Sequence, residues 1–525
     1  MSFQDEIKDA YTFEGESAVI GCGMFDGEPI DGLQITIPLK TLNRHGLIAG
    51  ATGTGKTKSL QVLAESLSDA SVPVLLMDIK GDLSGLGAAG STNKHIEKRS
   101  KHIGIEYKPS AYPLELLTLS DEPGTKLKAT VTEFGPVLLS KILDLNDTQE
   151  SIVSMIFKYC DDKSLPILDL KDFIKVLQFI TNEGKEELKA DYGNVSSQSV
   201  GTILRKVIGL QQQGADKFFQ EKSFEVDDLM RLDDQGRGMI STLRVMDMQD
   251  RPKMFSTFML QMMAELYGSL PEEGDLEKPK LVIFIDEAHL VFNDASKALL
   301  EQIENVIKLI RSKGVGIFFI TQNPTDVPSS ILSQLGLKIQ HALRAFTAND
   351  RDAIRKAAKN FPLSQYYKAD ELLTEMGIGE AFITLLDEKG RPTPLVHTLM
   401  RAPNSRMDIL TEEERDAIIA KSKIAAKYNK DIDSESAYEL LNEKLEEAAE
   451  KEEQEEKKET AAKEKKAAKR PTRRRKEKGT LETILTSPTT RQVGRTAASI
   501  LTRTLLGVLG LGGTTRRRRR KGSWF

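Results

Sequence analysis

Cysteines and long apolar runs are scarce in this chain. Its 525 residues include two cysteines, Cys22 and Cys160, too few and too far apart for a disulfide framework or a cysteine-ligated metal site. This usage fits a reducing compartment. No stretch of 18 apolar residues occurs, so no transmembrane helix is expected. The first residues, Met1–Glu6, are acidic and form no signal-peptide pattern. We therefore expect a cytoplasmic protein.

Acidic and basic residues are separated along the chain. Residues 463–525 contain 19 Lys/Arg and 3 Glu, which gives this segment a net charge of +16. Because the whole chain carries −4, residues 1–462 carry −20. The sequence therefore predicts an acidic body and a strongly basic tail. With 39% hydrophobic residues, the chain is long enough to bury a large core.

One segment matches a complete phosphate-binding loop, Gly-x-x-x-x-Gly-Lys-Thr. A short apolar run, Gly46–Ala49, precedes it, and Ser59–Leu67 follows with helical spacing. Strand, glycine-rich loop and helix are the context that the motif requires, which argues against a chance Gly/Thr-rich turn. Glycines let backbone N–H groups surround a polyphosphate, and a helix N-terminus adds partial positive charge. The loop consists of Gly50, Ala51, Thr52, Gly53, Thr54, Gly55, Lys56 and Thr57.

A pair of carboxylates complements this loop. Lys56 can reach the β- and γ-phosphates of a nucleotide, and the Thr57 hydroxyl can hold Mg²⁺. The continuous apolar run Lys280–Ile285 is typical of a buried parallel strand. Asp286, at its carboxyl end, is placed to support Mg²⁺, and Glu287 is placed to polarise a water for attack on the γ-phosphate. We therefore expect ATP hydrolysis with Mg²⁺. Solvated acids at an ordinary strand end are the alternative.

A third polar position follows the apolar run Gly314–Ile320. Gln322 is our candidate for a side chain that senses the γ-phosphate. The alternative is a turn residue before Asn323–Pro324, which is a strong breaker pair. His289, two residues after Glu287, is interpreted as structural rather than catalytic.

Apolar runs and helical segments alternate along the body, which predicts an α/β fold with a doubly wound, mostly parallel sheet. Asp78 and Asp82 follow a strand predicted at 72–77, and they either support the nucleotide site or cap a turn. Other strands are expected at 33–37, 238–243, 337–344 and 379–386, and helices at 251–268 and 348–359. The predicted divisions are a short β segment (1–40), an ATPase core (41–82 and 235–400), a mainly helical insertion (83–234), a helical extension (401–450), a charged low-complexity linker (451–480) and a basic amphipathic tail (481–525).

The motifs resemble those of the HerA/FtsK superfamily of RecA-like motor ATPases, through His45–Thr57, Ile283–His289 and Thr321–Pro324. More narrowly, the chain resembles the YjgR-type HerA-like proteins. This narrower resemblance rests on Tyr192–Ser196, Arg311–Gly316 and Ser434–Glu439. It implies a RecA-like P-loop NTPase, ATP with Mg²⁺, and a homo-oligomeric ring, most often a hexamer. The residue roles that it implies are phosphate binding by Gly53, Gly55, Lys56 and Thr57, metal support by Asp286, the catalytic base at Glu287 and sensing by Gln322.

The chain departs from the family pattern at its start. The loop begins at residue 50, which leaves too little preceding chain for the N-terminal β-barrel of many HerA proteins, so we do not expect docking to a nuclease through a barrel. No FtsK-like membrane anchor and no winged-helix module are evident. Ring motors complete their sites with an arginine from the adjacent subunit. Our candidates are Arg344 and then Arg311, with an ordinary surface arginine as the alternative for each.

The main hypothesis is an ATPase that couples turnover to translocation on, or remodelling of, nucleic acid, with DNA favoured. An acidic body argues against a wide DNA-lined surface, although a small basic pore is compatible with it. The alternative is a switch or assembly ATPase whose basic amphipathic tail docks on an anionic membrane or a protein partner. A disordered solubilising tail is a third interpretation. The sequence leaves open the polymer, the direction of movement, the ring size, the arginine finger and the pathway.

Overall fold

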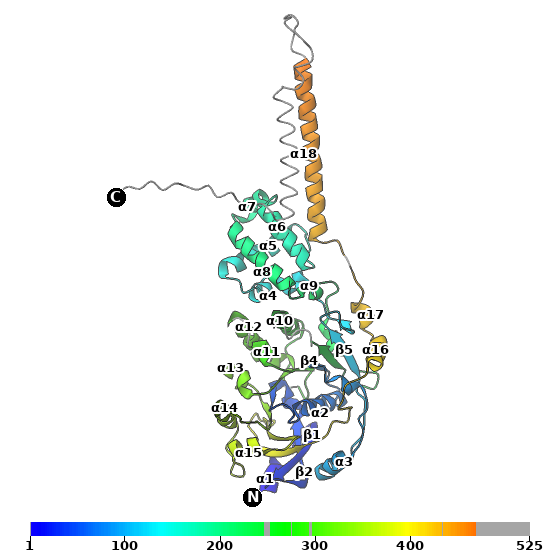
Figure 1. Cartoon of the computed structure of the whole chain (residues 1–525), viewed down its shortest axis with the longest axis vertical. Helices are drawn as coiled ribbons and strands as arrows, with labels where there is room; N and C mark the ends of the chain where they lie inside the picture. Colours follow the sequence, from blue (N-terminus) through cyan, green and yellow to red (C-terminus); the bar gives the residue numbers. More distant parts are fainter. Residues whose placement is uncertain (1, 246–251, 275, 293–296, 433, 469–525) are drawn as a thin grey trace, which may run out of the picture. The chain divides into compact units, whose positions relative to one another are not determined.

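The computed structural model describes residues 2–468 except 246–251, 275, 293–296 and 433 (Figure 1). The chain divides into two units, Met1–Glu447 and Ala448–Phe525. All of the described strands belong to the first unit, and the second begins within the long helix α18 (Ala437–Ala468). The predicted amphipathic tail lies outside the described residues. None of the described helices combines the length and apolar character needed to span a membrane.

One mixed sheet of 12 strands runs through the described part of the first unit, in the order β2-β1-β12-β11-β10-β3-β9-β8-β4-β7-β5-β6. Neighbours from β10 to β6 are parallel, whereas those from β2 to β10 are antiparallel. The mostly parallel sheet is confirmed, with an antiparallel edge that the sequence did not predict. The strands are β1 (Ser17–Phe25), β2 (Glu28–Pro38), β3 (Gly46–Ala49), β4 (Val74–Asp78), β5 (Leu114–Thr118), β6 (Thr125–Lys126), β7 (Ile240–Arg244), β8 (Leu281–Ile285), β9 (Val315–Thr321), β10 (Leu337–His341), β11 (Glu380–Thr384) and β12 (Val396–Met400).

Alternate residues of the central strands enter two separate cores. In β4, Leu75 and Met77 belong to one core, and Val74 and Leu76 belong to the other. Successive side chains of a strand point to opposite faces, so a sheet covered on both faces needs continuous apolar strands. The covering helices are α10 (Pro252–Ser269) and α12 (Lys297–Ile310) on the first face, and α1 (Phe3–Ala10) and α2 (Lys56–Asp69) on the second.

The helical insertion is shorter than the predicted range 83–234, because β5 and β6 belong to the sheet. We did not predict β5, since Glu115 interrupts its apolar run. In the structure the Glu115 carboxylate accepts a hydrogen bond from Thr125 Oγ1 at 3.0 Å and pairs with Arg231 at 3.1 Å, which satisfies a buried charge. The insertion helices are α4 (Val131–Ile142), α5 (Asp147–Asp162), α6 (Leu170–Thr181), α7 (Lys185–Tyr192), α8 (Ser197–Gln211) and α9 (Ala215–Phe218).

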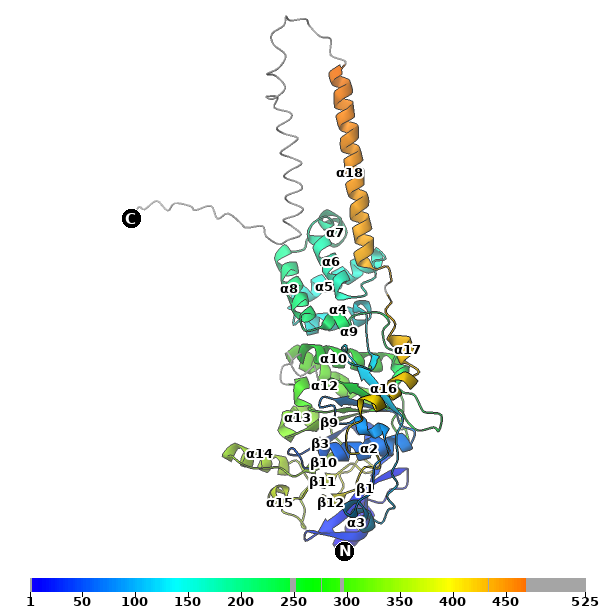
Figure 2. The same cartoon turned by 45° about the vertical axis from the view of Figure 1, so that its right-hand side comes forward.

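Local signals start the insertion helices, and apolar packing joins them to the core. Thr130, Asn146 and Asp169 are N-caps whose side chains accept from backbone N–H groups, each within a capping box. The helices share a continuous apolar cluster with α10 and α12, on which they stack in both views (Figure 2). The insertion is thus part of the first unit.

The N-terminal residues complete the sheet of their own chain. Strand β1 pairs with β12, where Gly21 lies opposite Met400, and β2 pairs with β1. The buried Tyr11, at the end of α1, donates from its hydroxyl to the carbonyls of Ile383 (3.0 Å) and Pro394 (2.7 Å). Strands β1 and β2 therefore extend the antiparallel edge of the sheet.

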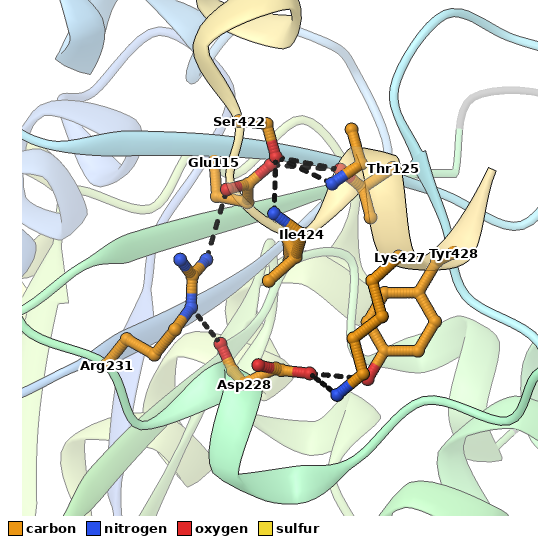
Figure 3. Close-up of polar contacts among 9 residues, drawn as sticks. Glu115, Thr125, Asp228, Arg231, Ser422, Ile424, Lys427 and Tyr428 are labelled. Atoms are coloured by element: carbon orange, nitrogen blue, oxygen red, sulfur yellow. Dashed lines mark hydrogen bonds and ion pairs between the residues drawn. The ribbon is translucent and has the colours of Figure 1, made fainter.

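The C-terminal extension is fastened to the far edge of the sheet (Figure 3). Ser422, between α16 and α17, lies 3.4 Å from Thr125 of β6. Lys427 and Tyr428, in α17, both bond Asp228, and the Lys427 distance is 2.8 Å. These contacts tie Ser422 to β6 and α17 to the short 3-10 helix Val226–Leu229, both of which are distant in sequence. The remaining helices are α3 (Lys94–Ile103), α11 (His289–Phe292), α13 (Ser329–Leu332), α14 (Ala348–Ala358), α15 (Ala369–Glu375), α16 (Glu412–Lys421) and α17 (Ala425–Tyr428).

Candidate functional site

The phosphate-binding loop turns from β3 into α2 on three glycines with positive φ. The φ angles are 154° at Gly50, 78° at Gly53 and 118° at Gly55. A Cβ on Gly50 would lie 2.5 Å from the Cβ of His341, and a Cβ on Gly55 would lie 3.2 Å from the Cα of Gly379. Conformation and close approach together therefore require glycine in this loop.

Neighbouring strands hold the loop through backbone hydrogen bonds. The Ala51 N–H donates to the carbonyl of Ala342 at 2.8 Å, and the Gly379 N–H donates to the carbonyl of Thr54 at 2.9 Å. Arg99, from α3, donates to the Gly379 carbonyl at 3.0 Å and so stabilises the position of Gly379 beside the loop. Sequence reasoning missed Arg99, because it lies far from any recognised motif.

Lys56 lies folded over its own loop. Its Nζ donates to the carbonyls of Gly50 at 2.7 Å and Ala51 at 3.1 Å, and 7% of the residue is exposed. Burial lowers the pKa of Lys56, and the nearby Lys80 ammonium adds to the shift, while the carboxylates after β8 oppose it. A bound phosphate can replace these carbonyls as the partner of the Lys56 ammonium.

The N-terminus of α2 opens onto the same loop. Gly55 is its N-cap, so among the described residues no side chain caps the first N–H groups of this helix. Uncapped N–H groups at a helix N-terminus bind phosphate oxygens. Thr57 lies in that first turn and is partly exposed. The glycines, Lys56 and Thr57 thus fit a nucleotide polyphosphate with Mg²⁺.

Asp286 and Glu287 follow β8 at the edge of the sheet where the loop leaves β3. Because β3, β9, β8 and β4 are parallel neighbours, their carboxyl ends meet at that edge. Each carboxylate residue is 6% exposed. Glu287 has a φ of 46°, a left-handed conformation that is uncommon for a non-glycine residue and that recurs at functional sites.

The environments of these two carboxylates differ. Burial raises the pKa of Asp286 to about 7, although the Lys80 charge opposes the shift. Burial also acts to raise the pKa of Glu287, but the hydrogen bond and charge of Lys80 outweigh it and leave that pKa below its ordinary value. Glu287 is therefore ionised at neutral pH. A divalent cation would favour the ionised form of Asp286.

Three side chains surround the Glu287 carboxylate. Gln322, after β9, lies near enough to lower the pKa of this carboxylate, and His289 Nδ1 lies 3.3 Å from Oε2. Lys80, after β4, binds Oε1 through Nζ. The structure thus brings Gln322 to Glu287, as expected for neighbouring strand ends. It also gives His289 a contact to the expected base. Lys80 was not recognised as a site residue, although it lies between the two aspartates that were considered.

Of those two aspartates, Asp78 caps a turn. Its carboxylate accepts from the N–H groups of Gly81 at 2.6 Å, Asp82 at 3.2 Å and Leu83 at 3.0 Å, and the residue is fully buried. Burial raises the pKa of Asp78 to about 6. Asp78 therefore shapes the turn that carries Lys80.

His341 packs against Gly50 of the loop, and the sequence analysis did not identify it. Its Nδ1 lies 2.8 Å from the Glu380 carbonyl and therefore carries the proton, which leaves Nε2 to accept from the Ser59 hydroxyl at 2.9 Å. Burial lowers the pKa of His341 to about 4, and the Lys56 charge adds to this. The neutral imidazole thus connects β10 to α2.

The two candidate arginine fingers are exposed at opposite ends of the parallel strands. Arg344 follows β10 on the loop side and donates to the carbonyl of Thr374 at 3.0 Å. Arg311 precedes β9, at the opposite end. A finger acts in a neighbouring subunit, so the role of either residue stays a prediction.

Two relatives named as helicases match about two thirds or more of this chain. The chain is 24% identical over 362 residues to a "DNA double-strand break repair helicase HerA" of Sulfurisphaera tokodaii, a match that covers 67% of this chain and 64% of that protein. A protein of the same name from Saccharolobus solfataricus is 20% identical over 380 residues, which cover 72% of this chain and 68% of the relative. The match to the first relative thus spans less than two thirds of its length.

Solved structures resemble the fold at low sequence identity. The plasmid coupling protein TrwB in complex with a non-hydrolysable ATP analogue has a TM-score of 0.52 and 12% identity, with 77% of this chain and 94% of TrwB covered. TrwB with a GTP analogue has a TM-score of 0.51 and 12% identity, over 77% of this chain and 95% of TrwB. The likeness supports the assignment as a RecA-like P-loop fold.

A family model matches nearly the whole chain. The model described as "Helicase HerA-like C-terminal" aligns with residues 26–518. This range contains the loop and the carboxylate pair after β8. The chain therefore belongs to the helicase HerA-like C-terminal family.

Proposed function

We propose that this protein hydrolyses ATP with Mg²⁺ and couples turnover to translocation on, or remodelling of, nucleic acid, with DNA the favoured polymer. The observation that carries the proposal is the placement of Glu287. It is an ionised, buried carboxylate with a left-handed backbone, paired with Lys80 at the edge of the sheet where the phosphate-binding loop begins. Simple nucleotide storage needs no such base.

The residues divide the chemistry among them. The backbone N–H groups of residues 53–57 and the Lys56 ammonium bind the phosphates. Thr57 and Asp286 would hold Mg²⁺, which withdraws charge from the phosphates when it is bound. Glu287 accepts the proton of the attacking water, and Gln322, at the end of the neighbouring strand, senses the γ-phosphate.

The nucleic-acid part of the proposal rests on the relatives and on charge. The two HerA relatives are named as DNA double-strand break repair helicases. The net charge of +16 in residues 463–525 would bind phosphates without sequence preference. By superfamily analogy, we further propose a homo-oligomeric ring, most often a hexamer, in which Arg344 or Arg311 completes a neighbour's site.

Steady-state ATP hydrolysis with duplex DNA, single-stranded DNA and RNA tests this function, with Lys56→Ala as the blank. Heparin serves as a matched polyanion, because it carries charge without bases. We expect one nucleic acid to raise kcat well above the effect of heparin. A rate that no nucleic acid changes would rule out the coupling.

The division of charge favours a second candidate, a switch or assembly ATPase that docks through its tail on an anionic membrane or a protein partner. Vesicle sedimentation distinguishes it from the first. Binding to phosphatidylserine vesicles that is lost on deletion of residues 480–525, together with hydrolysis that DNA does not stimulate, would support this alternative.

A further inference from the structure

Lys80 projects into the candidate site from a rigid turn. It follows β4, which lies beside β8 with Met77 opposite Ile285. The buried Asp78 carboxylate accepts three backbone N–H groups of the turn after it, so the backbone that carries Lys80 is fixed. The side chain itself is long and flexible. The turn therefore fixes the backbone position of Lys80, whereas the flexible side chain allows its ammonium to reach different anionic partners.

The present partner of that ammonium is the expected catalytic base. Lys80 Nζ binds Oε1 of Glu287, and 41% of the Lys80 side chain is exposed, against 8% for Glu287. An ion pair on the base reduces its readiness to take a proton from water. In this structure the Lys80 ammonium neutralises the charge of Glu287. Because the Lys80 side chain is partly exposed, it can turn away from Glu287 with no change in the backbone.

A second ammonium that can bind anions, that of Lys56, lies near Lys80. Lys56 follows β3 and Lys80 follows β4, so the two lysines lie on either side of β9 and β8 at the edge where the carboxyl ends of these parallel strands meet. The Lys80 charge lowers the pKa of Lys56, and the two carboxylates after β8 raise it. Two ammoniums thus flank Asp286 and Glu287, one from the loop and one from β4. Phosphate oxygens that Lys56 binds at the end of a triphosphate would come within the reach of Lys80.

We propose that Lys80 is a positioning residue that senses the terminal phosphate: it holds Glu287 in the nucleotide-free chain and leaves it for the γ-phosphate of a bound triphosphate. The inference rests on the proposed ATPase function. A phosphate group carries more negative charge than a carboxylate and competes for the same ammonium. A bound diphosphate offers no such competitor, so Glu287 stays paired and the base is active only when there is substrate to hydrolyse.

Nucleotide binding tests this assignment directly. We would measure the Kd of the non-hydrolysable triphosphate AMPPNP and of ADP, with Mg²⁺, for wild type, Lys80→Met and Lys80→Arg. Lys80→Met should weaken AMPPNP roughly tenfold and leave ADP within about twofold, since one charge-assisted contact to the γ-phosphate is lost. Lys80→Arg should restore most of the AMPPNP affinity. Lys278→Met is the matched control, because that lysine bonds a backbone carbonyl at the other end of β8.

Competition for the ammonium predicts a further result in a double-mutant cycle. Glu287→Gln removes the charge that holds Lys80, so it should tighten AMPPNP binding and not ADP binding. In a Lys80→Met background the same change should have no such effect. Coupling of this kind is not expected if Lys80 only stabilises the fold.

The outcomes separate the two proposals. Equal losses for AMPPNP and ADP in Lys80→Met, or no loss of either, in a chain whose wild type binds both, would overturn the role of Lys80 and leave the ATPase function standing. A wild-type chain that binds neither nucleotide would overturn the ATPase function and this inference with it.

Discussion

Glu65, in the helix that follows the phosphate-binding loop, accepts two hydrogen bonds from Ser405, one from its backbone N–H at 2.9 Å and one from its hydroxyl at 2.6 Å. The other carboxylate oxygen accepts the Asn404 N–H at 2.9 Å and lies 3.7 Å from Arg401. Glu65 is fully buried. The chain that leads from β12 to α16 is therefore anchored on α2 itself.

Glu65→Gln should destabilise the protein, because the amide brings N–H groups to a place where every neighbour is a donor. A buried donor without an acceptor costs about 1–3 kcal/mol. Chemical denaturation would measure the loss. Glu97→Gln, at an exposed position in α3, is the control and should change the free energy of unfolding little. Equal stability of the two variants would contradict the anchoring role of Glu65.

Glu287→Gln should lower kcat by roughly 10²–10⁴-fold, the range that general base catalysis contributes. The substitution keeps the shape of the side chain and removes its ability to take a proton. Steady-state release of inorganic phosphate measures kcat. Glu277→Gln, at an exposed glutamate, controls for the substitution itself. Hydrolysis at the wild-type rate would exclude Glu287 as the base.

Acid should weaken the fold through His341. Its folded-state pKa of about 4 lies below the ordinary value of 6.5, so the neutral ring is favoured in the folded state. The resulting stability is complete above pH 6.5 and is lost as the pH falls toward 4, because the unfolded chain binds the proton first. The free energy of unfolding should therefore fall more steeply between pH 6.5 and 4.5 in wild type than in His341→Gln. Parallel pH profiles would show that another group is responsible.

Tyr428→Phe should loosen the C-terminal extension. The buried Tyr428 hydroxyl donates to Asp228 and accepts the Glu225 N–H at 2.9 Å, and the change leaves that N–H without its acceptor. We expect a cost of about 1–3 kcal/mol in the free energy of unfolding. Tyr107→Phe removes a surface contact of 3.5 Å and is the control. Faster protease cleavage around residues 411–429 in Tyr428→Phe alone would locate the effect.

Local patterns were enough to locate the loop, the six central parallel strands from β10 to β7 and the carboxylate pair. Gly50–Thr57 is a contiguous motif whose chemistry needs those residues at that spacing. A strand buried on both faces must be apolar throughout, so β8 and β9 were visible as unbroken runs. Gln322 was found because the carboxyl ends of neighbouring parallel strands meet at one edge.

Contacts between residues distant in sequence decided the rest. Lys80 became a site residue only when β4 took its place beside β8, and His341 only when β10 took its place beside β3. Strand β5 was hidden because its buried Glu115 depends on Arg231 for its charge partner. The sequence by itself determined which chemistry the chain can carry, because motif residues are close in sequence. The tertiary structure alone decided which ammonium meets Glu287, because strand order is set by packing and not by chain order.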